Sequence, residues 1–313
     1  MATQAQIEAV KVKDAPISVK FFELVNDLQL TQSEAANVLG LPFRTQVTVA
    51  QRPTAPRETT TPRTPRVSTT PWTFGVEMET VSPISREALA QKIAQFVGCQ
   101  SERYNHNDHA DHVYKIVQDG SVHGNGYETS AEVVSPILNN FDTLKKVCNA
   151  VNEAGCKVNR TCGLHVHIGA QNITLEHYKN VFINYALLEA AIDKFMAESR
   201  RKDNAYYAQP VRGHVFDIRC ARSIQDIADN VFDGVRYFKV NPQSYSRHQT
   251  IEFRQHQGST NFAKIKAWVN FLQKLVSWSE SHRLETDVEN INDIPFLTNA
   301  EKRYFNERAN ELA

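Results

Sequence analysis

The feature that most constrains the fold is a set of three short segments in which apolar and ionisable side chains alternate. They lie at residues 73–80 (TFGVEMET), 163–169 (GLHVHIG) and 249–256 (QTIEFRQH). Because successive side chains of a β-strand point to opposite faces, each segment predicts a strand with one apolar face and one chemically reactive face. Ordinary exposed strand faces are filled with Thr, Lys, Gln and Ser. The coincidence of three reactive faces therefore indicates a shared site.

Other segments complete the predicted architecture. Further short strands are expected at residues 113–118, 127–135 and 237–240. Amphipathic helices are expected at residues 86–97, 141–154, 175–199, 261–279 and 299–312. Strands interrupted irregularly by long helices favour an α+β domain, in which helices pack on one face of a sheet.

One break in composition divides the chain. Residues 51–70 (QRPTAPRETTTPRTPRVSTT) are rich in Pro, Thr and Arg and almost free of core-forming residues, which predicts a semi-extended linker. We therefore expect a small helical segment at 1–50, the linker at 51–70 and a catalytic domain at 71–313.

The segment before the linker predicts two short helices within residues 21–41. Thr31 and Glu34 form a capping-box pattern, and the run resembles the first half of a helix-turn-helix. No convincing recognition helix follows Pro42, so nucleic acid is a possible partner only through this N-terminal segment.

Charge and cysteine content exclude several classes of protein. The 35 basic and 35 acidic residues cancel, so no overall field favours a nucleic acid or a membrane surface as partner. Five cysteines without a C-x-x-C pair indicate neither a disulfide framework nor a structural zinc site.

The N-terminus does not resemble a secretory signal, and no run approaches roughly 18 apolar residues, which predicts a cytoplasmic protein without a membrane partner. Neither a P-loop nor a dinucleotide-binding motif occurs.

The first two alternating segments predict a metal site. Glu77 and Glu79 share one face of the first strand, about 7 Å apart, where their charges repel unless a cation lies between them. Hard divalent ions such as Mg²⁺ prefer oxygen ligands and leave room for substrate phosphates. His165 and His167 share one face of the second segment.

The third segment adds a phosphate-binding group. Glu252, Arg254 and His256 are expected on one face, with Ile251 and Phe253 on the other. Arginine binds phosphate in a bidentate manner, and a glutamate can ligate the ion that bridges those phosphates.

Two other enzyme classes are compatible with these residues. A metal-dependent hydrolase would use His165 and His167 with His123 as a third ligand, because zinc sites favour imidazole. A cysteine enzyme would use Cys162 with His165, although a thiol so close to a strand is more typical of a packed side chain.

Five motifs in order resemble the amidoligase family, which belongs to the carboxylate–amine ligase superfamily of glutamine synthetase and glutamate–cysteine ligase. The resemblance extends from about Trp72 to the C-terminus. The motifs are G-V-E-M-E at 75–79, D-G-S at 119–121, E-V-V-S-P at 132–136, G-L-H-V-H-I-G at 163–169 and E-F-R at 252–254.

The resemblance implies a glutamine synthetase-like catalytic domain with a curved antiparallel sheet and helices on its outer face. It implies ATP with Mg²⁺ or Mn²⁺, and substrates (small molecules, peptides or proteins) that carry a carboxylate and an amine. By motif, the implied metal ligands are Glu77, Glu79, Glu132, His165 and Glu252. Arg254 matches the phosphate-stabilising arginine, and Asp119 matches the acid near the incoming amine.

The remaining predicted roles concern proton transfer and substrate contact. An acyl phosphate must form and an amine must then attack it, so Asp119 or His167 would accept the amine proton. Loops at 101–111 and 237–248 are expected to exclude water from this intermediate. The predicted substrate- or nucleotide-binding residues are Ser121, Asn241, Arg247 and His256, with His248 a further contact.

Overall fold

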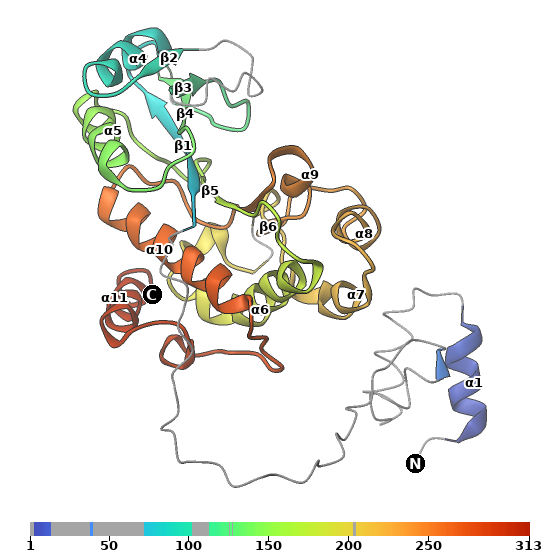
Figure 1. Cartoon of the computed structure of the whole chain (residues 1–313). Coiled ribbons are helices and arrows are strands. Elements are labelled where there is room, and N and C mark those ends of the chain that lie inside the picture. The colour runs from blue at the N-terminus through green and yellow to red at the C-terminus, as the bar shows by residue number, and fades with distance from the viewer. Residues whose placement is uncertain are drawn as a thin grey trace, which may run out of the picture. The chain divides into compact units, whose positions relative to one another are not determined.

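The computed structural model describes residues 3–13, 38–39, 72–101, 113–124, 126, 128–202 and 205–313 (Figure 1). Backbone contacts divide the chain into two units, Met1–Arg66 and Val67–Ala313, which are treated separately below. The predicted linker at 51–70 lies outside the described residues. So do nearly all of the predicted helical pair at 21–41 and of the polar loop at 101–111.

The first unit contains a helix that the sequence patterns did not predict. Helix α1 spans Gln4–Val12. The Thr3 hydroxyl accepts a hydrogen bond from the Gln6 backbone N–H, and the Gln6 side chain accepts one from the Thr3 backbone N–H. This reciprocal capping box satisfies two backbone donors at the N-terminus of α1.

The second unit is built on a seven-stranded sheet with the order β2-β3-β4-β1-β5-β7-β6. All neighbouring pairs are antiparallel except β2 and β3. The strands are β1 Phe74–Ser82, β2 Cys99–Ser101, β3 Tyr114–Val117, β4 Thr129–Val134, β5 Leu164–Gly169, β6 Val240–Asn241 and β7 Thr250–Phe253. Six of the seven correspond to predicted strands, and the three-residue β2 was missed.

The long helices follow the predicted pattern closely. They are α4 Arg86–Ala94, α5 Asp142–Glu153, α6 Leu175–Asp193, α10 Phe262–Ser279 and α11 Asn299–Glu311. Side chains of Ser85, Thr174, Asn261 and Thr298 cap four of them at the N-terminus. Among the described residues of this unit, the short helices are α7 Val215–Cys220, α8 Ile224–Asp226, α9 Ser244–His248, the π-helix η4 Ile227–Val231 and the 3₁₀ turns η2 Glu198–Arg200, η3 Arg212–His214 and η5 Ile291–Asp293. One or two turns leave too few residues for a periodic signal.

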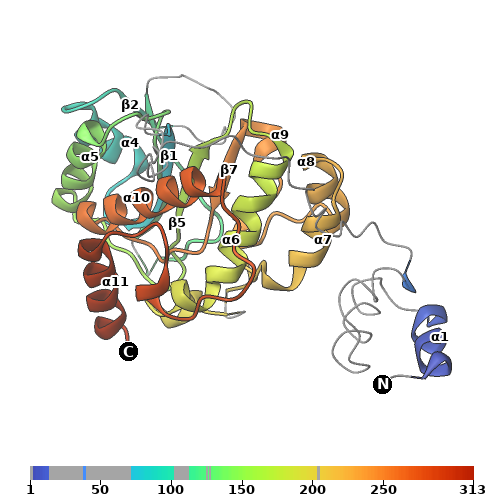
Figure 2. The same ribbon diagram turned by 60° about the horizontal axis from the view of Figure 1, so that its bottom comes forward.

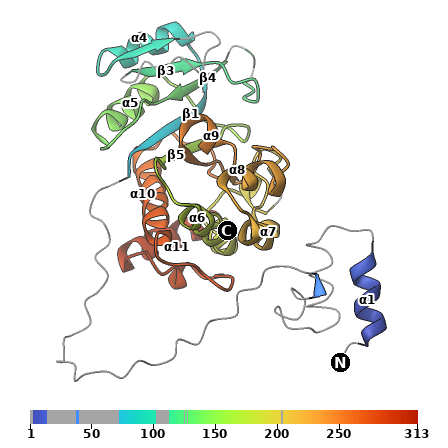
Figure 3. The ribbon, with the colours of Figure 1, turned by 45° about the vertical axis from the view of Figure 1, so that its right-hand side comes forward.

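One face of the sheet forms the core. Val76 and Met78 of β1 and Leu164, Val166 and Ile168 of β5 are buried in a single cluster with apolar residues of α5, α6 and α10. In Figure 2 α10 crosses in front of β1 and β5, with α5 on its left and α6 on its right, and in Figure 3 β1 runs from the β3–β4 side of the sheet to the side that carries β5 and α10. The predicted α+β class, with helices covering one sheet face, is therefore confirmed for this unit.

The alternation predicted for the last strand ends early. β7 stops at Phe253, and the His256 ring lies against Trp268 of α10, with 5.6 Å between ring centroids. Burial lowers the pKa of His256 to about 4, so the ring is neutral near pH 7. The prediction that His256 shares a face with Glu252 and Arg254 is wrong, because the backbone leaves the strand conformation before it.

No helix in the described part of the chain combines the length and the apolar character that crossing a membrane requires.

Candidate active site

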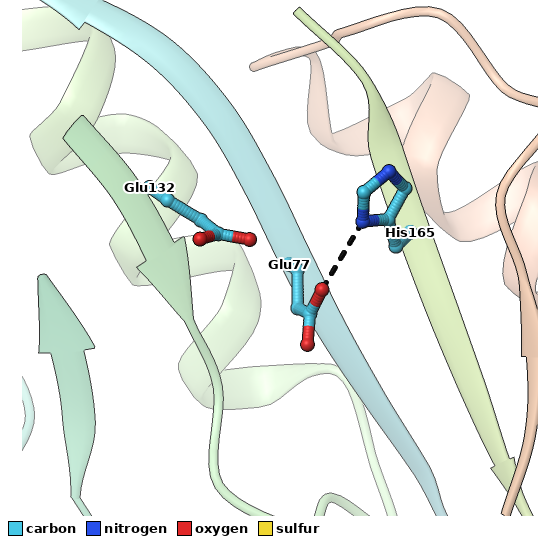
Figure 4. Close-up of side chains that lie close together, drawn as sticks. All are labelled: Glu77, Glu132 and His165. Atoms are coloured by element: carbon cyan, nitrogen blue, oxygen red, sulfur yellow. Dashed lines mark hydrogen bonds and ion pairs between the residues drawn. The ribbon is translucent and has the colours of Figure 1, made fainter. Parts of the chain in front are cut away.

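Glu77 lies at the centre of a cluster of ionisable side chains on the face of the sheet opposite the core. The β1–β5 register pairs it with His165, and its Oε2 lies 3.1 Å from Nδ1 of that ring (Figure 4). Its Oε1 lies 3.2 Å from Nε2 of His167. Burial opposes ionisation of Glu77, but His167 and His165 outweigh burial and hold its pKa well below the usual range. Glu77 is therefore an anion that bridges both histidines.

Glu79 holds the same cluster from two residues further along β1. One carboxylate oxygen accepts a hydrogen bond of 2.6 Å from the Gly163 backbone N–H. The other lies 3.3 Å from Nε2 of His165. The imidazole of His165 is thus flanked by a carboxylate at each of its nitrogens.

Glu132 enters from β4, on the other side of β1 (Figure 4). Its side chain is buried, and its Oε2 has no hydrogen-bond partner among the described residues. Burial, with the charges of Glu77, Glu79 and Asp119, raises the pKa of Glu132 well above the usual range. A buried carboxyl with an unpartnered oxygen beside three other acids is the environment that a bound cation stabilises.

Glu252 occupies the opposite side of the cluster, on β7. It accepts hydrogen bonds from Arg254 and, at 2.5 Å, from Nδ2 of Asn241. Burial raises its pKa, but Arg254 and then His167 outweigh burial, so the net shift is downward. The predicted residue Asn241 therefore orients a carboxylate, and it lines neither of the cavities described below.

Two hydroxyl groups contact the His167 ring at Nδ1, the nitrogen that does not face Glu77. Its Nδ1 lies 2.9 Å from Oγ1 of Thr250 and 3.4 Å from Oγ of Ser244. Burial lowers its pKa, but the charges of Glu252 and Glu77 outweigh burial and raise it. The protonated form of His167 is therefore stabilised.

The donor chemistry of the cluster fits hard divalent cations. Three sets of ligand atoms each lie within 4.8 Å of one another: Glu77, Glu132 and His165; Glu77, His167 and Glu252; and Glu79, Asp119 and Glu132. Each set has at least two carboxylates, and in the described part of the chain no set contains two histidines. Oxygen-rich sets of this kind suit Mg²⁺ or Mn²⁺ better than zinc.

Two cavities border the cluster, and they differ in character. The small pocket encloses about 310 Å³ and is lined by Glu79, Gln118, Asp119, Gly120, Ser121, Thr161, His165, Arg200, Tyr207, Arg236, Tyr237 and Arg254. The large pocket encloses about 520 Å³, and its lining includes Trp72, Phe74, Glu77, Lys115, Val134, Ile137, His167, Arg247 and His248. Glu77 and His167 line one pocket and Glu79 and His165 the other, so the cluster lies between them.

The remaining predicted residues divide between the pockets. Asp119 and Ser121 line the small pocket, where Asp119 Oδ1 accepts hydrogen bonds from the Ser121 backbone N–H at 2.6 Å and from its hydroxyl at 2.5 Å. Arg247 and His248 line the large pocket. His256 lines neither.

Some lining residues were not found from the sequence. Arg200 follows α6 in the short turn η2, and Tyr207 and Arg236 lie in irregular segments. None belongs to an alternating or helical pattern, so only spatial convergence on the small pocket identifies them.

The structure disfavours the third zinc ligand and the thiol nucleophile that the two competing enzyme classes would need. His123 is exposed and belongs to none of the candidate ligand sets in the described part of the chain. Cys162 is buried, and burial raises the pKa of its thiol, which disfavours the nucleophilic thiolate.

Comparison with known proteins agrees with this geometry. Residues 70–276 match the model of the family described as "Putative amidoligase enzyme", a range that contains every strand of the sheet and all the ligand sets. No curated protein matches the chain. The match covers more than half of the chain, so this protein is a member of the amidoligase family and, in general terms, a ligase.

Proposed function

We propose that the protein joins a carboxylate to an amine in an ATP- and divalent metal-dependent reaction that forms an amide (isopeptide-type) bond. The observation that carries the proposal is the oxygen-rich cluster between two cavities, with Arg254 beside it. Family membership supports a ligase in general, and the motif resemblance favours a glutamine synthetase-like arrangement on the open face of the sheet.

The large pocket is the better site for the nucleotide. Trp72, Phe74, Val134 and Ile137 supply an apolar lining that suits a purine base. Lys115 and Arg247 supply positive charge to the same cavity. The triphosphate would then extend toward Glu77 and His167, which lie at the boundary with the small pocket.

The metal-binding residues would be Glu77, Glu79, Glu132, His165 and Glu252. Bound Mg²⁺ or Mn²⁺ would screen the negative charge of the transferring phosphoryl group. Arg254 is buried, and Glu252 raises its pKa despite burial, so it remains a cation beside the ligands. Its planar fork suits the oxygens of a phosphoryl group in transfer.

The reaction balances in two steps. A substrate carboxylate oxygen attacks the γ-phosphorus of ATP, and the bond from this phosphorus to the bridging β-phosphate oxygen breaks. The products are ADP and an acyl phosphate. A neutral amine then attacks the acyl carbon and displaces inorganic phosphate. The amine loses one proton, which Asp119 in the small pocket or His167 in the large pocket would accept.

A phosphate-release screen tests this function. The full-length protein is incubated with ATP, Mg²⁺ and pairs from a panel of carboxylic acids and amines, and mass spectrometry detects any product. We expect phosphate release that requires both substrates and is abolished by a chelator, with formation of an amide. Tightly bound stoichiometric zinc, with hydrolysis in the absence of ATP, would contradict the proposal and favour the hydrolase.

A further inference from the structure

The small pocket has two walls of opposite charge. Glu79 of β1 and Asp119 of the turn between β3 and β4 supply carboxylates. Arg200, Arg236 and Arg254 come from the segment after α6, the segment before β6 and the residue after β7, and supply guanidinium groups. Arg254 is paired with Glu252, whereas neither Arg200 nor Arg236 has a carboxylate oxygen within 4.0 Å among the described residues.

Arg200 is a buried cation with little internal compensation. The residue is only 7% exposed, and burial lowers its pKa, although the charge of Glu79 opposes the shift in part. The one hydrogen bond that its side chain makes to the described residues runs from Nη2 to the carbonyl of Cys162, at 2.7 Å. A buried charge is costly unless it is paired, so a guanidinium that lines a cavity under these conditions favours an anionic ligand there.

Arg236, Tyr207 and Tyr237 line the same pocket, and Tyr206 packs beside the two tyrosines. The Arg236 guanidinium lies 5.3 Å from the centre of the Tyr237 ring. The rings of Tyr206, Tyr207 and Tyr237 contact one another, with centroids 5.1–5.8 Å apart. Tyr206 is 69% exposed and Tyr207 46% exposed, although both are large aromatic residues. We define these four residues as the aromatic rim, and it offers cover to a ligand that extends out of the cavity.

We propose that the small pocket binds an α-amino acid as the amine substrate. The substrate's own carboxylate is held by Arg200 and Arg236, its amine faces the Asp119 wall, and its side chain lies along the aromatic rim. This inference rests on the proposed function, because it names the class of amine that the ligase uses. Arg200 and Arg236 are then specificity-determining residues that recognise a group which does not react.

The alternative of nucleotide phosphates at these arginines is less favourable. The small pocket has about 310 Å³ against about 520 Å³ for the large one, and apart from the tyrosines of the aromatic rim its lining side chains are polar or charged. A planar guanidinium pair matches a carboxylate as well as a phosphate, so size and lining decide between them.

Isothermal titration calorimetry with matched ligands tests the proposal. The full-length protein, with Mg²⁺ and with or without ADP, is titrated with the twenty amino acids and with amines that lack the α-carboxylate, such as tyramine for tyrosine and cadaverine for lysine. We expect at least one amino acid to bind at least about tenfold more tightly than its amine. Arg236→Gln, at an exposed position, and Arg200→Lys should each remove most of that difference.

The matched control is Arg222→Gln, at an exposed arginine that lines neither pocket, and it should leave the discrimination unchanged. Equal binding of amino acids and amines, no binding of any amino acid, or loss of ADP affinity alone in the arginine variants would overturn the proposal. Amide formation with simple amines would refute this inference and leave the ligase function intact. Amino-acid binding without any ATP-dependent ligation would refute the ligase function, and with it the role of the amino acid as amine substrate, while the recognition of its carboxylate by the arginines would stand.

Discussion

The two faces of the sheet are made by the same strands and differ in almost every physical property. On β5, Leu164, Val166 and Ile168 are each 0% exposed and pack against helices. The alternate residues His165 and His167 contact carboxylates on the other face. The core face gains free energy by removing apolar surface from water. The site face gathers four acids and two histidines, whose desolvation costs free energy.

This difference indicates how substitutions should separate. A change on the core face should lower stability and leave the chemistry of the folded fraction intact. A change on the site face should remove activity while the protein remains folded, because removal of a buried carboxylate also relieves its repulsion with the other acids of the cluster. The four predictions below test that separation, from the largest expected effect to the smallest.

The Glu77→Gln/Glu79→Gln variant should have no measurable ATP turnover and should remain folded. Both carboxylates belong to the candidate ligand sets, and amides of the same shape cannot neutralise a divalent ion. Mg²⁺ should raise the melting temperature of the wild-type protein and not that of the variant, which differential scanning fluorimetry measures.

Glu289→Gln is the matched control, at an exposed acid outside both pockets. Wild-type turnover by the double variant would show that the acids on β1 are not metal ligands.

Leu164→Ala should lower the free energy of unfolding by about 2–5 kcal/mol. Its side chain is fully buried in the core, directly beside His165 in sequence but on the opposite face. Turnover per folded molecule should not change. Urea unfolding measures the free energy of unfolding, and the rate divided by the concentration of folded protein measures turnover. A large fall in turnover at unchanged stability would contradict the division between the faces.

Arg254→Lys should reduce turnover by about a hundredfold while nucleotide binding is retained. Lysine keeps the positive charge but loses the planar fork that can bind two phosphoryl oxygens at once. Steady-state kinetics and ADP titration measure the two effects. An unchanged rate would mean that Arg254 only neutralises Glu252, with which it is paired.

Glu189→Gln should change the pH dependence of the free energy of unfolding. Between pH 5 and 8 the wild-type protein should lose on the order of 2 kcal/mol relative to the variant. Glu189 lies on α6, where burial raises its pKa to about 7 although Lys239 opposes the shift. Because this pKa is above the unfolded value, the stabilisation is full below about pH 4.5 and is lost as pH rises through about 7. The wild-type protein should therefore lose stability over this range relative to the variant.

Thermal unfolding at several pH values makes the comparison. Parallel curves for the two proteins would mean that Glu189 is already ionised at pH 5 and that its contact with Lys239 outweighs burial.

The amino-acid sequence by itself determined which side chains share a face within each strand. Because the strand period is two, the pairs Glu77 with Glu79 and His165 with His167 follow from spacing alone, as do the long helices from their periodicity. The same rule failed at His256, where β7 ends at Phe253 and the polypeptide turns that ring toward Trp268. Local patterns do not specify where a strand stops.

Only the tertiary structure decided which strands are neighbours and which loops close the pockets. Strand order and register place Glu77 opposite His165 and Glu79 opposite Glu132, although about 50 to 90 residues separate the partners in sequence. Arg200, Tyr207 and Arg236 reach the small pocket from segments without any periodic pattern. The physical reason is that a strand's period is a property of its own backbone, whereas a pocket depends on long-range packing.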